Sequence, residues 1–195
     1  MKVVDLFCGC GGMGLGFQQA GFEIVYACDI DKYAIQSYRH NIGKHGVIAD
    51  ITKVKATDIP KADVWTFGFP CQDLSVAGKQ AGMEIGTRSG LFYEVMRLLD
   101  ECEENPSVIM AENVKGLKPY LPTLEQEFAK RGYKMTYQVY NSKYWGVPQN
   151  RERFYVVGFI GDMRLPIEDK SYIPKLSSIL AVSYTHLRAH ETRED

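Results

Sequence analysis

Short apolar segments typical of buried strands alternate along this chain with longer segments of helical periodicity, and this alternation restricts the fold more than any other feature. The strand-like segments are Lys2–Phe7, Glu23–Asp29, Val64–Phe69 and Val108–Ala111, and the helix-like segments are Lys32–Asn41, Leu91–Glu104 and Leu121–Arg131. Two further β-rich segments, Lys134–Tyr140 and Phe154–Ile160, are predicted to pair as an antiparallel edge. The alternation predicts an α/β fold in which helices cover both faces of a mostly parallel sheet.

Length and composition favour one domain. The chain has 195 residues, 45% of them hydrophobic and 24% charged, which is enough for a sizeable core. No apolar run approaches the roughly 20 residues that a membrane-spanning helix needs. The strand-like start lacks the basic region and cleavage site of a signal peptide, so we expect a cytoplasmic protein. The formal net charge of −1 neither reveals nor excludes the basic face of a nucleic-acid enzyme.

The five cysteines do not form a recognisable framework. Their odd number and irregular spacing argue against disulfides. Cys8 and Cys10 are too close together for the usual C-x-x-C metal knuckle, and no second cysteine or histidine pair follows nearby. We therefore expect no metal site.

Polar residues and glycines gather where the predicted strands end. These positions are Asp5–Gly12, Asp29, Asp50, Phe69–Gln72 and Glu112–Val114. In open parallel sheets, ligands bind beyond the carboxyl ends of the strands. The pattern therefore predicts a ligand site at this edge of the sheet.

The first three of these positions are typical of a nucleoside-containing ligand. The glycines after the first strand let a ligand approach the backbone, and Phe7 offers a flat ring for an adenine. Asp29 follows about 20 residues later, where a carboxylate commonly accepts from ribose hydroxyls. Asp50 ends another short strand and suits the exocyclic amine of adenine. Structural turns and helix caps explain these residues equally well, although Asp31 is the better N-cap candidate for the following helix.

The remaining positions carry reactive side chains. Cys71 follows a buried strand and a proline, and a deprotonated cysteine is a strong nucleophile. Glu112 ends an apolar strand, where desolvation raises the pKa of a carboxyl so that it can donate a proton. Arg151 and Arg153 lie two residues apart at the start of a strand, so both are expected on one face. A buried inert cysteine, a capping glutamate and salt-bridged surface arginines are the plainer interpretations.

Taken together, these motifs resemble the DNA cytosine-5 methyltransferase family. The strings that carry the resemblance are D-L-F-x-G-x-G-G from Asp5, G-F-P-C-Q from Gly68, E-N-V from Glu112 and Q-N-R-E-R from Gln149. They extend over Lys2 to about Ile160. The resemblance implies a Rossmann-like class I S-adenosylmethionine-dependent methyltransferase fold, with a doubly wound sheet and an antiparallel edge hairpin.

The resemblance implies S-adenosylmethionine as cofactor. Its binding residues would be Phe7, Gly9, Gly11, Gly12, Asp29, Ile30, Asp50, Ile51, Pro70 and Leu91. The family often has glutamate at the position of Asp29, so the acceptor here lies about one methylene closer to the backbone. Ile30 would cover the adenine where an aromatic sometimes stands.

The resemblance also implies a mechanism. Cys71 would add to C6 of a cytosine flipped out of double-stranded DNA, and the methyl group would then pass to C5. Glu112 would donate to N3, Arg153 would contact the O2 side, and Arg151 the catalytic loop or backbone. Further substrate-binding residues would be Gln72, Ser75, Asn113 and Gln149. The protein would act as a monomer in a restriction-modification or phage methylation system, with a cognate restriction endonuclease as a further partner.

Three alternatives stay open at this point. Transfer RNA cytosine-5 methylation uses the same motifs, a catalytically inactive relative would keep the fold, and a nicotinamide-dependent oxidoreductase would need a different glycine spacing. We expect residues 1–181 to be an incomplete catalytic domain that lacks the target-recognition region and the final helix. Residues 182–195 match one reading frame of a transposase-based sequencing adapter, so we expect them to be an assembly artefact.

Overall fold

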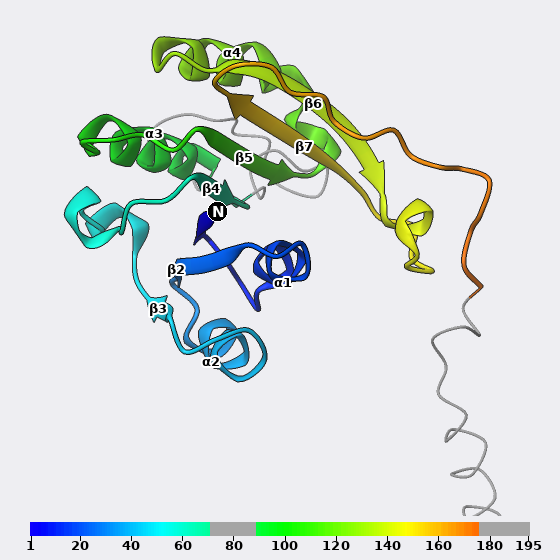
Figure 1. Ribbon diagram of the computed structural model, residues 1–195, viewed down its shortest axis with the longest axis horizontal. Coiled ribbons are helices and arrows are strands. Elements are labelled where there is room, and N and C mark those ends of the chain that lie inside the picture. The colour runs from blue at the N-terminus through cyan, green and yellow to red at the C-terminus, as the bar shows by residue number, and fades with distance from the viewer. Residues whose placement is uncertain (71–88, 176–195) are drawn as a thin grey trace, which may run out of the picture. The chain divides into compact units, whose positions relative to one another are not determined.

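A computed structural model of the chain describes residues 1–70 and 89–175. Seven strands form one sheet in the order β3-β2-β1-β4-β5-β7-β6 (Figure 1). Pairing is parallel from β3 to β5, whereas β7 is antiparallel to β5. The strands are β1 (Lys2–Leu6), β2 (Glu23–Asp29), β3 (Gly46–Ile48), β4 (Val64–Phe67), β5 (Val108–Asn113), β6 (Lys134–Asn141) and β7 (Glu152–Phe159).

Within the described residues, four α-helices and several 3₁₀ turns connect the strands. The α-helices are α1 (Gly12–Gln19), α2 (Lys32–Asn41), α3 (Phe92–Glu101) and α4 (Leu121–Lys130). The 3₁₀ turns are η1 (Ile51–Lys53), η2 (Ala56–Asp58), η3 (Ser89–Leu91), η4 (Lys115–Tyr120) and η5 (Ser142–Trp145). None of the helices in the two described stretches is long and apolar enough to cross a membrane.

The two faces of the sheet carry separate cores because side chains alternate along each strand. In β1, Val4 and Leu6 join the larger cluster, which α3 and α4 cover with Leu98, Phe128 and their neighbours. Val3 joins the smaller cluster with Tyr38 of α2. Helices on both faces confirm the predicted α/β arrangement.

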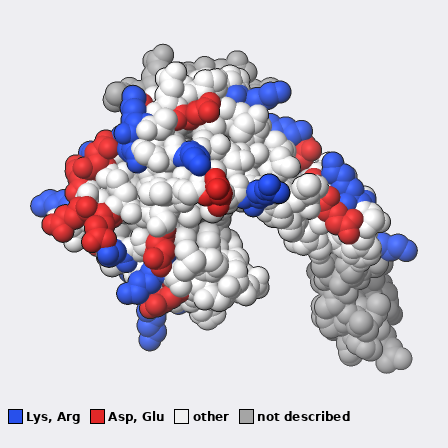
Figure 2. Space-filling model, turned by 45° about the horizontal axis from the view of Figure 1, so that its top comes forward, with Lys and Arg blue, Asp and Glu red and all other residues white. Residues whose placement is uncertain are grey.

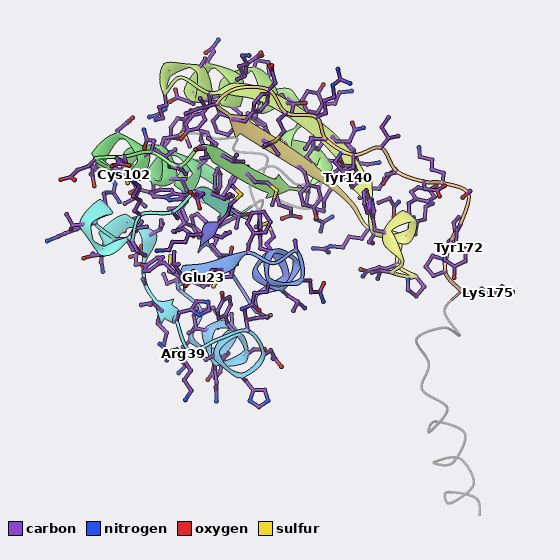
Figure 3. The ribbon with its side chains drawn as sticks, in the orientation of Figure 1. Glu23, Arg39, Cys102, Tyr140, Tyr172 and Lys175 are labelled. Carbon is purple, nitrogen blue, oxygen red and sulfur yellow. The ribbon has the colours of Figure 1, made fainter. Side chains whose placement is uncertain are left out.

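Local signals fix the helix boundaries. Asp31 caps α2, as its position predicted, by accepting from the N–H groups of Tyr33 at 2.7 Å and Ala34 at 3.1 Å. Near the other end of α2, the Nε of Arg39 donates to the carbonyl of Gly46 at 2.7 Å and holds the start of β3 (Figure 3). α3 is shorter than predicted, since its first predicted residue belongs to η3 and the helix ends at Glu101.

The β-rich segments after α4 form the predicted hairpin. Figure 1 shows β6 and β7 running in opposite directions. β7 begins two residues earlier than predicted, at Glu152, and it lies between β5 and β6 rather than at the edge. Arg151 therefore directly precedes the strand, and its sharing a face with Arg153 stays a prediction.

The chain divides into two compact units. One comprises Met1–Val139 with Arg153–Leu165, and the other Tyr140–Glu152 with Pro166–Asp195. In the second unit, the hydroxyl of Tyr140 donates to the carbonyl of Pro166 at 2.6 Å. The backbone N–H of Asn141 donates to the carboxylate of Glu168 in the same unit.

Candidate functional site

A cavity of about 170 Å³ opens at the carboxyl ends of β1, β2 and β4, the edge where the sequence predicts a ligand. Its lining is Phe7, Cys28, Asp29, Ile30, Ala49, Asp50, Ile51, Gly68, Pro70 and Leu91. All the predicted cofactor residues except the three glycines are in this set. The structure thus brings together side chains from five separate stretches of the chain.

The turn after β1 has a left-handed backbone at three positions. Phe7 has φ 54°, Gly9 φ 53° and Gly11 φ 95°. Phe7 is an uncommon residue for this region, which costs an L side chain roughly 1–2 kcal/mol, and the turn holds its ring at the cavity. Strained backbone of this kind is concentrated at ligand sites.

Packing alone is enough to require glycine at position 11. A Cβ at this position would lie 2.4 Å from Cγ1 of Ile42 and 2.9 Å from Cδ2 of Tyr38. A Cβ on Gly9 or Gly12 would meet nothing within 4 Å. Of the three predicted cofactor glycines, Gly9 and Gly12 therefore have open space beside them, whereas Gly11 lets α2 pack against the turn.

Asp29 connects the turn to the end of β2. Its Oδ2 accepts from the N–H of Gly9 at 2.9 Å, and its Oδ1 accepts from the N–H of Asp31 at 2.9 Å. These two bonds hold the carboxylate at the cavity and leave each oxygen with further acceptor capacity. This is the arrangement that a ribose diol needs.

Asp50 has a structural contact as well as its place in the cavity. Its Oδ1 caps η1 by accepting from the N–H of Thr52 at 3.1 Å and from the Thr52 hydroxyl at 2.8 Å. These bonds, with the nearby Lys53 ammonium, lower the pKa of Asp50. Both interpretations of this residue, the cap and the ligand contact, are compatible with the structure.

The η1 segment is fixed from a helix far along the chain. Arg97 of α3 donates to the carbonyl oxygens of Ile51 at 3.1 Å and Val54 at 3.0 Å. The same guanidinium bonds Glu94 at 2.8 Å and Glu101 at 2.9 Å. Arg97 was not predicted as a site residue.

Glu112 and Arg153 form an ion pair beside the cavity. Nε of Arg153 lies 3.0 Å from Oε1 of Glu112, and each side chain is 23% exposed. A Cβ on Gly68, which lines the cavity, would lie 3.5 Å from Oε2 of Glu112. Two of the predicted catalytic residues are therefore in contact, and the carboxylate of Glu112 reaches the segment that precedes Cys71.

Asn113 ties this segment to the sheet. Its Nδ2 donates to the carbonyl of Phe69 at 3.0 Å, and its Oδ1 accepts from the N–H of Val114 at 2.8 Å. The side chain is buried. Asn113 thus positions the Phe69–Pro70 backbone, and a direct contact with substrate stays a prediction.

The described cysteines that lie within the fold are poor candidates for a thiolate. Burial raises the pKa of Cys28 to about 12. Burial, followed by the negative charges of Asp5 and Asp29, raises the pKa of Cys8 as well. At the end of α3, burial also raises the pKa of Cys102. Cys10 is exposed.

Five predicted site residues lie either outside the described residues or in the second unit. Cys71, Gln72 and Ser75 lie outside the described residues. Gln149 and Arg151 belong to the second unit. There, the backbone N–H of Arg151 donates to the carbonyl of Gln149 at 3.1 Å. Their roles stay predictions.

Three lining residues were missed by the sequence analysis, Cys28, Ala49 and Gly68. Each directly adjoins a predicted position, since Cys28 precedes Asp29, Ala49 precedes Asp50, and Gly68 opens the G-F-P-C-Q string. The only sequence feature that could have identified these three residues is their position next to a predicted site residue. Small or apolar side chains carry no chemical pattern of their own.

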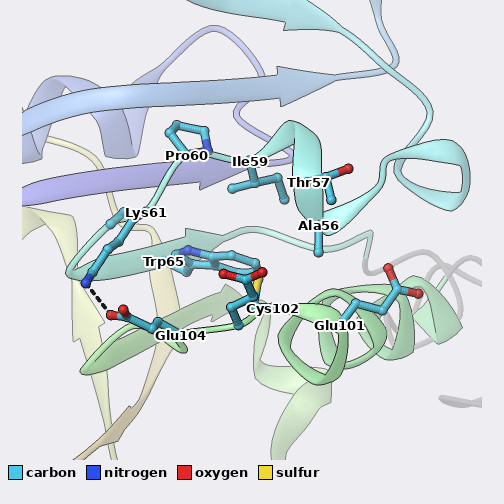
Figure 4. A pocket seen from close by; sticks show the side chains of 11 residues that line it. Ala56, Thr57, Ile59, Pro60, Lys61, Trp65, Glu101, Cys102 and Glu104 are labelled. Carbon is cyan, nitrogen blue, oxygen red and sulfur yellow. Dashed lines mark ion pairs between the residues drawn. The ribbon is translucent and has the colours of Figure 1, made fainter.

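A second cavity, of about 310 Å³, lies where β4 begins and α3 ends (Figure 4). Its floor is Trp65, and its rim holds Glu101, Cys102 and the ion pair of Lys61 with Glu104. Apart from Cys102, these rim residues are exposed. Ligands of open α/β sheets bind at the opposite, carboxyl edge, so this cavity is not the candidate site.

On the face shown in Figure 2, basic and acidic side chains are intermixed. Within residues 1–70 and 89–175, no group of three or more His, Cys, Asp and Glu side chains is placed to hold a metal ion.

The strand order, the antiparallel β7 and the cavity beyond β1 and β2 define a Rossmann-like fold of the class I methyltransferase type. The profile of the family described as "C-5 cytosine-specific DNA methylase" matches residues 1–191. The chain belongs to this family.

Named relatives agree with this membership. The chain is 41% identical to the type II methyltransferase M.NlaX of Neisseria lactamica over 175 residues, 85% of this chain and 55% of the relative. It is also 41% identical to the type II methyltransferase M.Bsp6I of Bacillus sp. (strain RFL6), over 82% of this chain and 52% of the relative. The chain thus spans about half the length of these relatives.

Solved structures share the fold. The Dnmt2 methyltransferase of S. pombe superposes with a TM-score of 0.75 and 22% identity, over 93% of this chain and 61% of that protein. A putative DNA modification methyltransferase from an E. coli prophage gives a TM-score of 0.67 and 28% identity, over 90% and 51%.

Proposed function

We propose that the protein takes part in methyl transfer from S-adenosylmethionine to C5 of cytosine in DNA. The observation that carries the proposal is the placement of the cavity beside the Glu112–Arg153 ion pair, since a Cβ on Gly68 of the cavity lining would lie 3.5 Å from Oε2 of Glu112. Family membership and the names of the relatives support it.

The lining residues fit the adenosine end of the cofactor. Asp29 offers acceptors for the ribose, and Asp50 lines the same cavity together with apolar residues suited to a flat base. The volume of the cavity, about 170 Å³, is below the roughly 300–1,000 Å³ usual for ligand pockets. We therefore assign the cavity to part of the cofactor only. When bound, S-adenosylmethionine supplies an activated methyl group.

The residues of this chain would prepare the cytosine. Cys71, which directly follows Pro70 of the cavity, is the proposed nucleophile that forms a bond to C6. Glu112 would hold N3 and the exocyclic amine. Because the Arg153 guanidinium favours the ionised carboxylate, Glu112 would take up a proton before it donates to N3. Arg153 lies against that carboxylate at 3.0 Å and would fix its direction while contacting the O2 side of the base. These reacting atoms are reached only when the base is outside the duplex.

A trapping experiment tests the proposal. Duplex DNA containing 5-fluorocytosine, with S-adenosylmethionine, should become covalently attached to the protein because fluorine cannot leave as a proton does. We expect peptide mapping to place the adduct on Cys71, and Cys71→Ala to abolish it. Cys10→Ala is the matched control, since Cys10 is exposed and should leave the adduct unchanged.

Other outcomes would exclude the proposal. Attachment that survives in Cys71→Ala would refute the nucleophile. A labelled methyl group that appears in transfer RNA but never in DNA would favour the RNA substrate instead.

A further inference from the structure

The side chain of Arg97 is not part of the cavity lining, but it holds one wall of the cavity in place. That wall is Asp50 and Ile51, at the start of η1. β3 ends at Ile48, so the wall lies beyond the last residue of the strand. Arg97 bonds it from another element, since its Nη2 donates to the carbonyls of Ile51 at 3.1 Å and of Val54 at 3.0 Å. A cation is favourable at this end of a helical turn because the carbonyl dipoles point toward it.

The guanidinium of Arg97 uses all five of its N–H donors in one network. Its Nε donates once to Glu94 at 2.8 Å, and its Nη1 donates twice to Glu101, at 2.9 Å to each carboxylate oxygen. The remaining two bonds are those of Nη2 to the η1 carbonyls. The two glutamates lie three residues before and four residues after Arg97 on α3, so they orient the fork from both sides. A lysine ammonium cannot reproduce this planar arrangement.

The carboxylate of Asp50 depends on η1 for its direction. Oδ1 of Asp50 accepts from the N–H of Thr52 at 3.1 Å and from the Thr52 hydroxyl at 2.8 Å. Because Thr52 is the middle residue of η1, a shift of η1 moves both donors. Oδ2 lies 3.8 Å from Nζ of Lys53, which is outside hydrogen-bond range, and it retains acceptor capacity for a ligand.

An acceptor at this place distinguishes between purines. Adenine carries an exocyclic amine, which donates, whereas hypoxanthine carries a carbonyl oxygen at the same position, which only accepts. An ionised carboxylate has no proton to donate, so it bonds the amine and repels the carbonyl oxygen. Asp50 can make this distinction only while η1 holds its carboxylate at the cavity.

We propose that Arg97 is a positioning residue that sets the preference of the cavity for adenine over hypoxanthine. Arg97 acts through η1, which fixes the position of Oδ2 of Asp50. The helix that carries Arg97 begins directly after Leu91, another lining residue, so α3 is connected to two parts of the lining. The inference rests on the proposed use of S-adenosylmethionine and assigns part of its recognition to a side chain outside the lining.

Titration calorimetry of the 195-residue chain with two ligands tests this inference. The ligands are S-adenosylhomocysteine and S-inosylhomocysteine, which has a carbonyl oxygen in place of the exocyclic amine. The wild type should bind the adenine ligand more tightly. Arg97→Met keeps the aliphatic part of the side chain and removes the donors. It should lower the affinity for the adenine ligand about 2–10-fold, the value of one hydrogen bond, and leave that for the hypoxanthine ligand unchanged.

Arg131→Met is the matched control. Arg131 also connects two helices through carboxylates, since it donates to Asp100 of α3 and, at 2.9 Å, to Glu127 of α4, but neither it nor its partners line the cavity. This variant removes a similar network and should keep the wild-type ratio of the two affinities. Arg97→Lys, which keeps the charge without the fork, should give a ratio between those of the wild type and Arg97→Met.

The possible failures are distinguishable. If the wild type binds neither ligand, the proposed cofactor is wrong and this inference with it. Equal binding of both ligands by the wild type, or a wild-type ratio in Arg97→Met, would overturn the role of Arg97 alone. A ratio that falls equally in Arg131→Met would show a general loosening of the fold and would also refute that role. If Arg97→Met does not fold, Arg97→Lys decides, and a wild-type ratio in that variant would overturn the inference.

Discussion

The three glycines of the turn after β1 differ in what a methyl group would meet, and this allows a graded test of the structure. Gly11→Ala should be strongly destabilising for two reasons. The left-handed φ of 95° costs an alanine roughly 1–2 kcal/mol. The added Cβ would also lie 2.4 Å from Ile42, and such overpacking typically costs about 1–3 kcal/mol.

The expected loss for Gly11→Ala is therefore about 2–5 kcal/mol of unfolding free energy, a drop in Tm of roughly 4–20 °C at this chain length. Gly9→Ala has the backbone strain, at φ 53°, but its added Cβ would contact nothing. We therefore expect it to lose about 1–2 kcal/mol of unfolding free energy. Gly12→Ala has neither and should change stability by no more than about 0.5 kcal/mol.

Urea denaturation followed by circular dichroism would measure the three variants. The loss of unfolding free energy should be largest for Gly11→Ala, smaller for Gly9→Ala and smallest for Gly12→Ala. If Gly11→Ala were as stable as Gly9→Ala, α2 would not pack against the turn as described, and the reasoning would be refuted.

Four shorter predictions concern the carboxylates and the asparagine. Glu112→Gln should lower methyl transfer by about 10²–10⁴-fold and leave cofactor affinity nearly unchanged; normal turnover would refute the acid role. Asn113→Ala leaves the carbonyl of Phe69 without its donor and should cost about 1–3 kcal/mol in urea melts, which an unchanged midpoint would contradict. Asp31→Ala should cost about 0.5–2 kcal/mol through the lost α2 cap, whereas Asp31→Asn should retain most of that stability. Asp5 keeps its proton to about pH 7 in the folded state but loses it near pH 4 when unfolded, so the folded state loses relative stability as pH rises between these values. Asp5→Asn should therefore be more stable than wild type at pH 8 but not at pH 4, and a difference that does not vary with pH would exclude the shift.

The sequence predicted the sheet and most of the cavity because both follow from local patterns. Apolar runs mark the strands, and parallel strands bring their carboxyl ends to one edge, so Asp29, Asp50 and Pro70 were placed correctly by their positions at strand ends. The cap role of Asp31 was predictable for the same reason, since a cap depends on the two or three residues that follow it.

Contacts between distant segments were not predictable. Arg97 reaches the carbonyl of Ile51, 46 residues earlier, and Asn113 reaches that of Phe69, 44 residues earlier. Both depend on which strands are neighbours, and the sequence alone does not give that order. Likewise, the start of β7 was missed by two residues, since the strand begins at Glu152 and not at Phe154.

The place of β7 between β5 and β6 has a consequence for synthesis on the ribosome. β6 is made before β7, yet among the described strands its only neighbour in the sheet is β7. During translation β6 and the free edge of β5 are both unpaired strand edges, which are the segments of a nascent chain most prone to aggregate. They remain so until Glu152–Phe159 has left the exit tunnel. We therefore expect this edge to be the last part of the sheet to form, and the part on which a nascent chain most depends for protection by chaperones.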